Sequence, residues 1–578
     1  MDPAFNTNPK TSTSIQPQAT IPSGLTMKSL SVVTAGLVLG LPQTLAAPSK
    51  AQIKWGKCNL PWGKATDAAL YGETECATLK APLDYTKPDN GKTIDLQLAR
   101  VKAKVQPAKG SVFYNPGGPG NSAVEYLVTG TEEYYQVLGG QYNLVAVDPR
   151  GTGRTLPFNC TIEEEDDETE SSKSKLSRRF DVLPQVNLWP QVKGETWDSL
   201  GEKAERCYKA RKETGAFIGT AFSARDIMTA VDALGEDGML RYWGISYGTV
   251  LGQTLAGMFP DRIDRMVLDG NVMIDEYVMG LNPSLVKDTE RSMLHLIDEC
   301  VKSGPKLCPL ADWAGSNTTV EILTVAIEEV WTNLLKVSKI PESWGLPEDA
   351  SFFQGGASFL ERIKNHIQQQ LYVPSNFGDL AAFIEKMIDE EWAEVYEIMY
   401  PSSDEEEEEV TEVWNWGEDA LDGIYCGDQA YRAETVDDLY SAWALHSEQS
   451  SFSDTGASSE LTCARWPFKA AETIDMNKFK HVNTKMPILF VNSRYDPITP
   501  LVSAYEASTR FNGSRVVVHE GEGHGIHGNP SVCTYTAIID YFKNGRLPKP
   551  GVSCPVKTPI FQMLWEQQEA ARNATESE

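Results

Sequence analysis

The sequence predicts an α/β fold, in which a mostly parallel sheet has helices on both faces and a helical lid is inserted between the two halves of the sheet. Three observations lead to this prediction. Short apolar runs alternate with stretches of helical periodicity in two parts of the chain, a glycine-flanked serine joins one such run to one such stretch, and the residues between the two parts lack strand-like runs. Continuous apolar strands that alternate with helices are typical of a parallel sheet covered on both faces.

The first half of the sheet is expected to contain two short strands. These apolar runs, at 111–114 and 142–147, each end in a glycine-containing turn. Apolar residues at helical spacing over 224–234 predict a helix, which Gly235 closes. A strand over 240–245, a helix over 249–259 and a strand over 263–268 follow.

The second half of the sheet is expected near the C-terminus, with strands over 487–492 and 515–518 and a helix over 532–542. Between the halves, amphipathic helices rich in Trp and Glu are predicted around 285–301, 320–337 and 377–400. We interpret this stretch as a lid inserted into one core. The expected division is a first core part at 47–271, the lid at 272–424, a second core part at 425–560 and a tail at 561–578.

The N-terminus has the layout of a secretory signal peptide at residues 27–46. Lys28 precedes an apolar stretch over 30–41, and small residues at Ala46-Ala47 fit a cleavage site. Residues 1–26 are polar and are expected to be an extension, natural or added, upstream of the natural start. No later run of 18 or more apolar residues exists. We therefore expect a protein of the extracellular space or the secretory-pathway lumen, without a membrane anchor.

The ten cysteines, an even number, fit an oxidising compartment. They contain no CxxC pair, which argues against a zinc or thioredoxin-like site. Five disulfides between sequence neighbours are the simplest hypothesis, although spacing alone does not fix the connectivity. The cysteines are Cys58, Cys76, Cys160, Cys207, Cys300, Cys308, Cys426, Cys463, Cys533 and Cys554. Four sequons, at Asn159, Asn317, Asn512 and Asn573, are candidates for glycosylation on export.

The charge balance excludes two classes of partner. The chain has 52 Lys and Arg against 80 Asp and Glu, a formal net charge of −28. Such a chain repels phosphate backbones and anionic lipid, so nucleic acid is not an expected partner. Two acidic runs, at 163–170 and 404–409, are expected to be solvated surface; the alternative is a funnel that attracts a cationic substrate.

The sequence Gly244-Ile245-Ser246-Tyr247-Gly248 lies between a predicted strand and a predicted helix. Such a turn is so tight that the residues two before and two after the serine have no room for side chains, and it exposes the serine Oγ. An ordinary glycine-rich turn is the alternative. The flanking strand and helix favour Ser246 as a nucleophile.

A serine nucleophile needs a base and a carboxylate downstream. His524 lies in a glycine-rich loop after the strand at 515–518, and Asp496 lies in the loop after the strand at 487–492. A turn aspartate before proline is the alternative for Asp496. We expect His519 and His527 to be structural or surface residues; a metal site built from the three histidines lacks a ligand pattern, and neither a metal nor a cofactor is expected.

The oxyanion of acyl transfer needs fixed backbone N–H donors. One is expected from Tyr247, at the start of the helix that follows the nucleophile. The other is expected from the glycine-rich turn after the first strand, at Gly117 or Gly118. The alternative is a plain turn.

Taken together, these motifs resemble the tripeptidyl-aminopeptidase-like branch of the α/β-hydrolases, whose relatives include the prolyl aminopeptidases. The motifs are NPGGPG (115–120), DPRGTGRT (148–155), ARD…LG (224–235), GISYGTVLG (244–252), FPDRIDRMVLDG (259–270), DPITP (496–500) and GHGIHGNPSVC (523–533). The resemblance implies the α/β-hydrolase fold, Ser246, Asp496 and His524 as the triad, and exopeptidase action on peptide N-termini. Cys426, Cys463, Cys533 and Cys554 match the family's C-terminal cysteine pattern. The prolyl enzymes have a histidine where this chain has Pro116, and the lid has no motif that matches.

Three hypotheses follow. The first is a secreted serine hydrolase that removes residues or short peptides from free N-termini, with lid carboxylates selecting the ammonium group. The second has the same catalytic residues but a small ester, lactone or other secondary metabolite as substrate, because one fold supports many hydrolyses. The third is a non-catalytic binding protein on a hydrolase scaffold. Peptide and small ester are thus the expected substrate classes, and the oligomeric state is left open.

Overall fold

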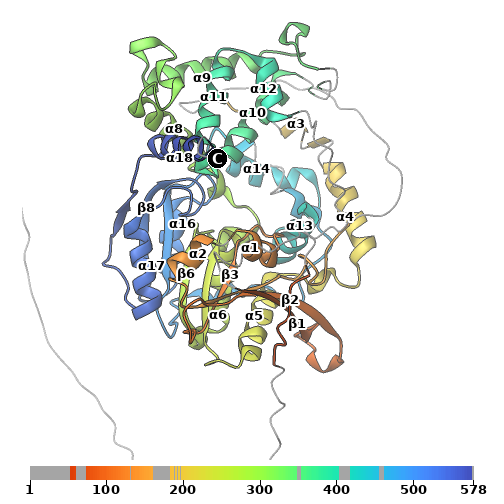
Figure 1. Ribbon diagram of the computed structural model, residues 1–578. Coiled ribbons are helices and arrows are strands. Elements are labelled where there is room, and N and C mark those ends of the chain that lie inside the picture. Colours follow the sequence, from red (N-terminus) through yellow and green to blue (C-terminus); the bar gives the residue numbers. More distant parts are fainter. Residues whose placement is uncertain are drawn as a thin grey trace, which may run out of the picture. The chain divides into compact units, whose positions relative to one another are not determined.

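The computed structural model describes residues 52–59, 73–130, 132–160, 183–187, 189–191, 193–194, 197–347, 350, 353, 355–401, 417–454 and 461–575. The expected signal peptide and both acidic runs lie outside these residues. Figure 1 shows the described elements, which include a sheet with helices on both of its faces.

The sheet is mostly parallel, as the sequence predicts. Within the described residues its strand order is β1-β2-β4-β3-β5-β6-β7-β8-β9. The pairs β1–β2 and β2–β4 are antiparallel, and every other pair is parallel. The strands are β1 Thr74–Pro82, β2 Thr93–Val101, β3 Ser111–Asn115, β4 Asn143–Val147, β5 Leu240–Ile245, β6 Ile263–Asp269, β7 Leu489–Tyr495, β8 Arg515–Glu522 and β9 Ser553–Pro555.

Alternate residues of the central strands supply two separate cores. On β5, Tyr242 packs into the core that contains α5 and α6, whereas Trp243 packs into the core that contains α1 and α17. This is the period of two that a strand buried on both faces requires. The helices on the sheet are α1 Ala123–Thr129, α2 Glu132–Val137, α5 Thr220–Leu234, α6 Tyr247–Met258, α16 Leu501–Thr509 and α17 Val532–Asn544.

The lid is inserted between β6 and β7 and has a hydrophobic core of its own. It confirms the predicted helical insertion, but the single helix expected over 377–400 is two helices, α11 and α12, which are separated at Glu390 (φ 58°). Its helices are α7 Ile274–Met279, α8 Thr289–Ser303, α9 Val320–Leu334, α10 Gly356–Leu371, α11 Phe377–Ile388 and α12 Trp392–Met399. The chain returns to the sheet through α13 Gly417–Asp428 and α14 Tyr440–Ser447, and α3 Trp189–Gln191 and α4 Trp197–Arg211 lie between β4 and α5.

The segment expected as a tail forms a helix, α18 Ile560–Thr575. Its first residues Ile560, Phe561 and Leu564 are buried in the core of the lid, and Figure 1 shows α18 beside α8. The lid is therefore linked to the C-terminal part of the chain through α18 as well as through the chain connection at its own end. No described helix combines the length and the apolar character that crossing a membrane requires.

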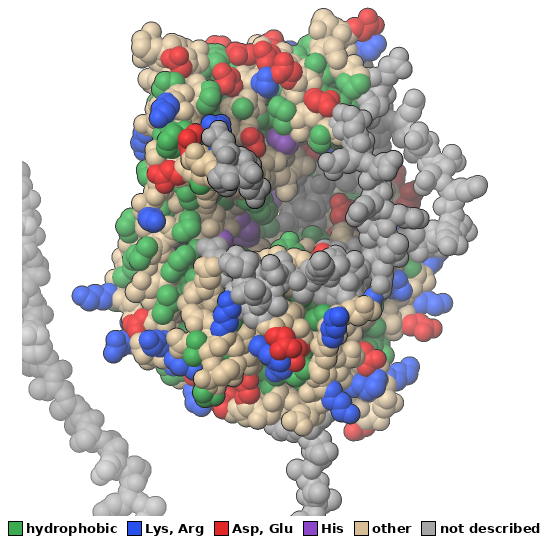
Figure 2. Space-filling model, in the orientation of Figure 1, with side chains coloured by type: hydrophobic (Ala, Val, Ile, Leu, Met, Phe, Trp, Pro, Cys, Tyr) green, Lys and Arg blue, Asp and Glu red, His purple; other side chains and the backbone are tan. Residues whose placement is uncertain are grey.

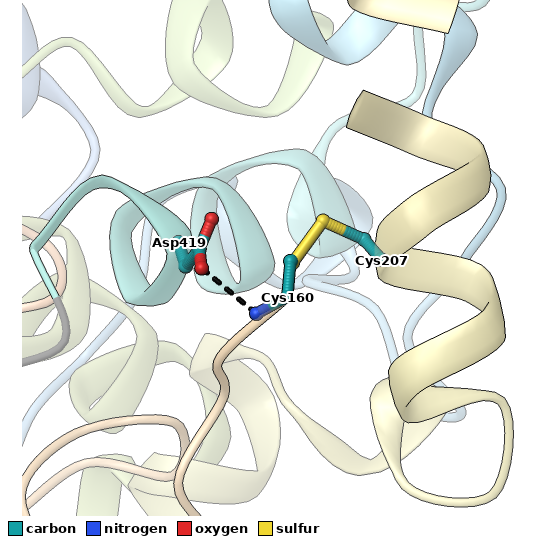
Figure 3. Close-up of side chains that lie close together, drawn as sticks. All are labelled: Cys160, Cys207 and Asp419. Atoms are coloured by element: carbon teal, nitrogen blue, oxygen red, sulfur yellow. Dashed lines mark hydrogen bonds between the residues drawn. A yellow bond between two sulfur atoms is a disulfide. The ribbon is translucent and has the colours of Figure 1, made fainter. Parts of the chain in front are cut away.

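All ten cysteines are paired with their sequence neighbours, which confirms the simplest hypothesis. The pairs are Cys58–Cys76, Cys160–Cys207, Cys300–Cys308, Cys426–Cys463 and Cys533–Cys554. Figure 3 shows the second pair, which joins the segment after β4 to α4. The backbone N–H of Cys160 donates to Asp419 Oδ2 at 2.8 Å, so the same point also holds the start of α13.

A buried ion pair fixes the turn that follows β4. The guanidinium of Arg150 donates to both oxygens of Asp226 on α5, at 2.7 and 2.9 Å, and neither side chain is exposed by more than 2%. Its remaining N–H groups donate to the backbone oxygens of Pro82 and Leu83. Arg150 of the DPRGTGRT motif and Asp226 of the ARD motif thus join β1, the turn after β4 and α5.

Candidate active site

A cavity of about 540 Å³ lies where β3, β5, β7 and β8 end and the lid begins. Figure 2 shows a hollow on this face with histidine and hydrophobic side chains on its wall. Its described lining includes Ser246 and His524 together with Pro116, Gly118 and Tyr247. A site at the carboxyl ends of parallel strands is the usual location of function in open α/β sheets.

Ser246 occupies the tight turn that the sequence predicts. It joins β5 to α6 with φ 56° and ψ −125°, a conformation that L-residues rarely adopt. A Cβ added at Gly244 would lie 2.3 Å from Gly248 O, and a Cβ at Gly248 would lie 2.6 Å from Asn115 O. Both glycines are therefore required by close backbone contacts. The N–H of Ser246 donates to Asp269 O at 3.0 Å, which ties the turn to the end of β6.

The structure brings Asp496 and His524 together. The Nδ1 of His524 lies 3.0 and 3.1 Å from the two oxygens of Asp496, which is fully buried. Asp496 also accepts hydrogen bonds from the backbone N–H groups of Ile498 and Thr499 and from Thr499 Oγ1, at 2.7 to 3.0 Å. These bonds hold the carboxylate in one orientation. His524 Nδ1–H can donate to it, which leaves Nε2 as the nitrogen able to accept a proton.

The Nε2 of His524 has no hydrogen-bond partner within the described residues, and no bond to Ser246 Oγ is formed. Both residues nevertheless line the same cavity. Burial lowers the pKa of His524, but the charge and hydrogen bond of Asp496 outweigh burial, and Asp269 acts in the same direction, so that the pKa is raised above its usual value. A raised pKa is what a base needs in order to hold a proton transiently near neutral pH.

The glycine-rich loop after β3 lies beside Ser246. The N–H of Gly117 donates to Asn115 Oδ1 at 3.1 Å, whereas in the described chain the N–H groups of Gly118 and Tyr247 have no acceptor. Gly118 and Tyr247 both line the cavity. Of the three expected oxyanion donors, these two have N–H groups available for a ligand.

The lid directly contacts the loop that contains His524, a feature that the sequence did not indicate. Tyr372, the residue after α10, accepts the backbone N–H of His524 at 2.8 Å, and the two rings form a T-shaped pair 5.3 Å apart. A Cβ at Gly523 or Gly528 would lie 2.5 or 2.2 Å from Pro374, two residues further along the lid. In the sequence, only the high glycine content of this loop indicated a close contact, and it did not indicate which segment makes that contact.

The other two C-terminal histidines have different positions. His519 is fully buried and its Nδ1 lies 3.1 Å from Thr534 Oγ1, consistent with a structural residue. His527, expected to be structural or at the surface, instead lines the cavity. Its Nε2 lies 3.5 Å from Asp269 Oδ2. Asp269 is fully buried, and neither of its side-chain oxygens has a hydrogen-bond partner in the described chain.

Tyrosines form much of the cavity wall, and no Asp or Glu is among its described lining residues. The lining tyrosines are Tyr114, Tyr126, Tyr134, Tyr247, Tyr277, Tyr372 and Tyr425. Tyr247, Tyr277 and Tyr425 are neighbours, with ring centroids 5.9 and 5.2 Å apart along the series, and Asn282 donates a hydrogen bond to the hydroxyl of Tyr425. We call these three rings the tyrosine wall.

A buried carboxylate lies directly behind the tyrosine wall. Asp428, at the end of α13, accepts hydrogen bonds from Tyr277 Oη (3.0 Å), from the backbone N–H of Thr220 (2.9 Å) and from Thr220 Oγ1. Thr220 Oγ1 also bonds the hydroxyl of Tyr247 at 2.6 Å. Burial raises the pKa of Asp428 to about 6, although the bonds from Thr220 and Tyr277 lower it. The expected selection of an ammonium group by lid carboxylates at the cavity surface therefore has no described residue to support it.

Two family models match the chain. A model of the α/β hydrolase fold matches residues 110–292, and a model described as TAP-like protein matches residues 448–554. Neither match extends over residues 293–447, which include most of the lid.

Three curated proteins illustrate the likeness over the whole chain. The chain is 27% identical over 526 residues to a tripeptidyl aminopeptidase of Streptomyces lividans, with 89% of each chain covered. It is 25% identical over 525 residues to serine protease Hip1 of Mycobacterium tuberculosis, covering 89% of this chain and 94% of that protein. It is also 24% identical over 530 residues to carboxylesterase B of Mycobacterium tuberculosis, covering 89% and 92%.

Proposed function

Because this chain is an α/β-hydrolase of the TAP-like family, we propose that it is a serine exopeptidase that releases residues or short peptides from free N-termini. The observation that supports this proposal best is that Ser246, His524, Gly118 and Tyr247 line one cavity, with Asp496 bonded to His524. The names of two relatives, a tripeptidyl aminopeptidase and a serine protease, support the peptide substrate.

In the proposed mechanism Ser246 Oγ attacks the scissile carbonyl while His524 Nε2 takes its proton. The oxyanion that forms accepts hydrogen bonds from the N–H groups of Gly118 and Tyr247, which the backbone holds in place before the reaction. His524 then gives the proton to the departing amine, and the peptide bond breaks. Water attacks the acyl-enzyme with His524 again as base, which releases the new carboxylate and restores Ser246. Asp496 holds the imidazole in one tautomer and stabilises its charged form.

An esterase is the second candidate function. The relative named carboxylesterase B has the same coverage of this chain, and the described cavity lining lacks a carboxylate that would contact a substrate ammonium directly. The triad chemistry is common to both functions, so the substrate distinguishes them.

A paired assay tests the proposal. Wild type and Ser246→Ala are compared on trialanine p-nitroanilide, on its N-acetyl form and on p-nitrophenyl acetate. We expect wild type to prefer the free-amine peptide, and Ser246→Ala to lower kcat on every substrate by at least about 10⁴-fold, since nucleophile removal costs about this much or more in a serine protease. Hydrolysis of the ester and the blocked peptide alone would exclude the exopeptidase. Undiminished activity of Ser246→Ala would exclude the mechanism.

We also propose that the protein is secreted. The signal-peptide layout of residues 27–46 and the five disulfides support export to an oxidising compartment. Among the four sequons, Asn317, Asn512 and Asn573 are exposed and Asn159 is half-buried. The exposed three are the better candidates for glycosylation, because a glycan needs a surface position.

A further inference from the structure

An exopeptidase that acts on free N-termini must recognise an ammonium group, and a buried site usually provides a carboxylate for it. Among the described residues that line the cavity there is no carboxylate. The described wall does contain other groups that attract a cation. Aromatic rings and hydroxyl oxygens are the chemistry that remains, and tyrosine supplies both.

Asp428 places a negative charge against the tyrosine wall, because it is bonded to Tyr277. Its side chain is 1% exposed and bonds to neutral donors, Thr220 and Tyr277. In the described part of the chain no Lys, Arg or His forms an ion pair with it. A buried carboxylate without a cation is costly, and a ligand cation placed nearby compensates the charge. Tyr277 is the connection, because it donates its O–H to Asp428 and its side chain lines the cavity.

The other fully buried carboxylates near the cavity fit this role less well. Asp269 lies 3.5 Å from the imidazole of His527, which can supply a counter-charge within the protein. Asp148 accepts hydrogen bonds from Ser122 and Val124, neither of which is among the described lining residues of the cavity. Asp428 is thus the buried carboxylate that combines a neutral surrounding with a bond to the cavity wall.

We propose that the tyrosine wall, with Asp428 behind it, is the subsite that binds the N-terminal ammonium of the substrate. This inference rests on the proposed exopeptidase function and names the recognition element of the same site. The rings of Tyr247, Tyr277 and Tyr425 attract the cation through their faces, and the hydroxyl of Tyr277, polarised by Asp428, accepts a hydrogen bond from it. Three elements supply the wall: α6, α7 at the start of the lid, and α13 at its end.

A binding measurement separates this subsite from catalysis. Trialanine and N-acetyl trialanine are tested as competitive inhibitors of p-nitrophenyl acetate hydrolysis, and the ratio of their inhibition constants measures amine recognition. We expect wild type to bind the free amine more tightly. Tyr277→Phe keeps the ring but removes the bond to Asp428, and it should reduce the ratio by about tenfold, the lower end of what a hydrogen bond to a charged group contributes. Asp428→Asn should reduce the ratio at least as much.

Tyr208→Phe is the matched control. Tyr208, on α4, is 49% exposed and is not among the described lining residues of the cavity, so the same loss of a hydroxyl there should leave the ratio unchanged. A purely structural role of Asp428, as a cap for the start of α5, predicts instead a lower melting temperature with an unchanged ratio. That result would overturn the inference. If Asp428→Asn does not fold, the ratio of inhibition constants in Tyr277→Phe tests the inference by itself.

The proposed function can fail separately. If wild type hydrolyses trialanine p-nitroanilide and requires its free amine, while Tyr277→Phe has the wild-type ratio, the exopeptidase stands and the subsite is wrong. If wild type binds both inhibitors equally and hydrolyses no peptide, the proposed function is wrong and the subsite with it.

Discussion

The two sides of the cavity differ in what they provide for a buried carboxylate. On one side Asp496 lies 3.0 Å from the imidazole of His524, a group that can become a cation. On the other side Asp428 is bonded to hydroxyl groups and one backbone N–H, none of which can carry a positive charge. Both carboxylates are essentially fully buried, so exposure does not distinguish them.

The difference in partners gives the two carboxylates different chemical uses. A carboxylate beside an imidazole stabilises the proton that the base takes during the reaction. A carboxylate surrounded by neutral donors has no internal cation to stabilise, and its charge acts on whatever enters the cavity. Both assignments are proposals: proton transfer belongs to the side of Asp496, and ammonium recognition belongs to the side of Asp428. Substitutions that remove each charge without changing the shape test this distinction.

The largest expected effect comes from Asp496→Asn. The amide is nearly the same shape, but it can hold His524 in the wrong tautomer and cannot stabilise its charged form. We expect kcat to fall by about 10⁴-fold, the loss that the same change causes in a serine protease. The measurement is kcat on the free peptide, the blocked peptide and the ester. All three should fall together, because none depends on the amine at this side of the cavity. A loss confined to the free peptide would contradict the assignment.

A smaller effect, about tenfold, is expected from pH on amine binding. The carboxyl of Asp428 is anionic above its pKa of about 6, and a peptide amine is cationic below about 8. The groups that face Asp428 are Thr220 of α5, Tyr247 of α6 and Tyr277 of α7, and burial raises the pKa of both tyrosines far above this range. Trialanine should therefore inhibit best between pH 6 and 8.

N-acetyl trialanine provides the control for this pH window, because it has no amine and its inhibition constant should be flat across it. In Asp428→Asn the loss of binding below pH 6 should disappear, whereas the loss above pH 8 should remain, since the latter belongs to the ligand. If trialanine binding by Asp428→Asn still weakens below pH 6, a group other than Asp428 causes the weakening.

The catalytic side could be predicted from the sequence far better than the recognition side. The turn around Ser246 is encoded locally, because two backbone contacts exclude any side chain at Gly244 and Gly248. Asp496 and His524 follow strands whose apolar runs are continuous, and parallel strands end at one edge of a sheet. Local geometry and topology together were enough to bring these residues to one place.

The recognition side depends on contacts that no local pattern encodes. Tyr277 and Asp428 are 151 residues apart, at the two ends of the lid, and their meeting depends on how the lid closes on the sheet. Tyr372 reaches the backbone of His524 for the same reason. By contrast, β2 was missed although its signal was present: Ile94, Leu96 and Leu98 are buried and alternate strictly with more exposed residues.

The smallest expected effect concerns Asp269 and His527, which lie 3.5 Å apart beside His524. The charge of Asp269 raises the pKa of His524, and the charge of His527 lowers it. The other groups around His524 are Asp496, the hydroxyl of Thr499 and the ring of Tyr372. Because His524 must be neutral to act as a base, Asp269→Asn should move the acid limb of kcat/KM for the N-acetyl peptide to lower pH, and His527→Gln should move it to higher pH.

The opposite signs make this last comparison informative even though each shift is smaller than the effects above. A structural role of Asp269 would lower the plateau of kcat/KM and leave the limb in place, because packing damage does not select one protonation state. Shifts of the same sign in both variants would show that the two charges do not act on His524 separately. Opposite shifts with an unchanged plateau would instead extend the catalytic side to a second carboxylate, at the end of β6, and a second imidazole, in the loop after β8.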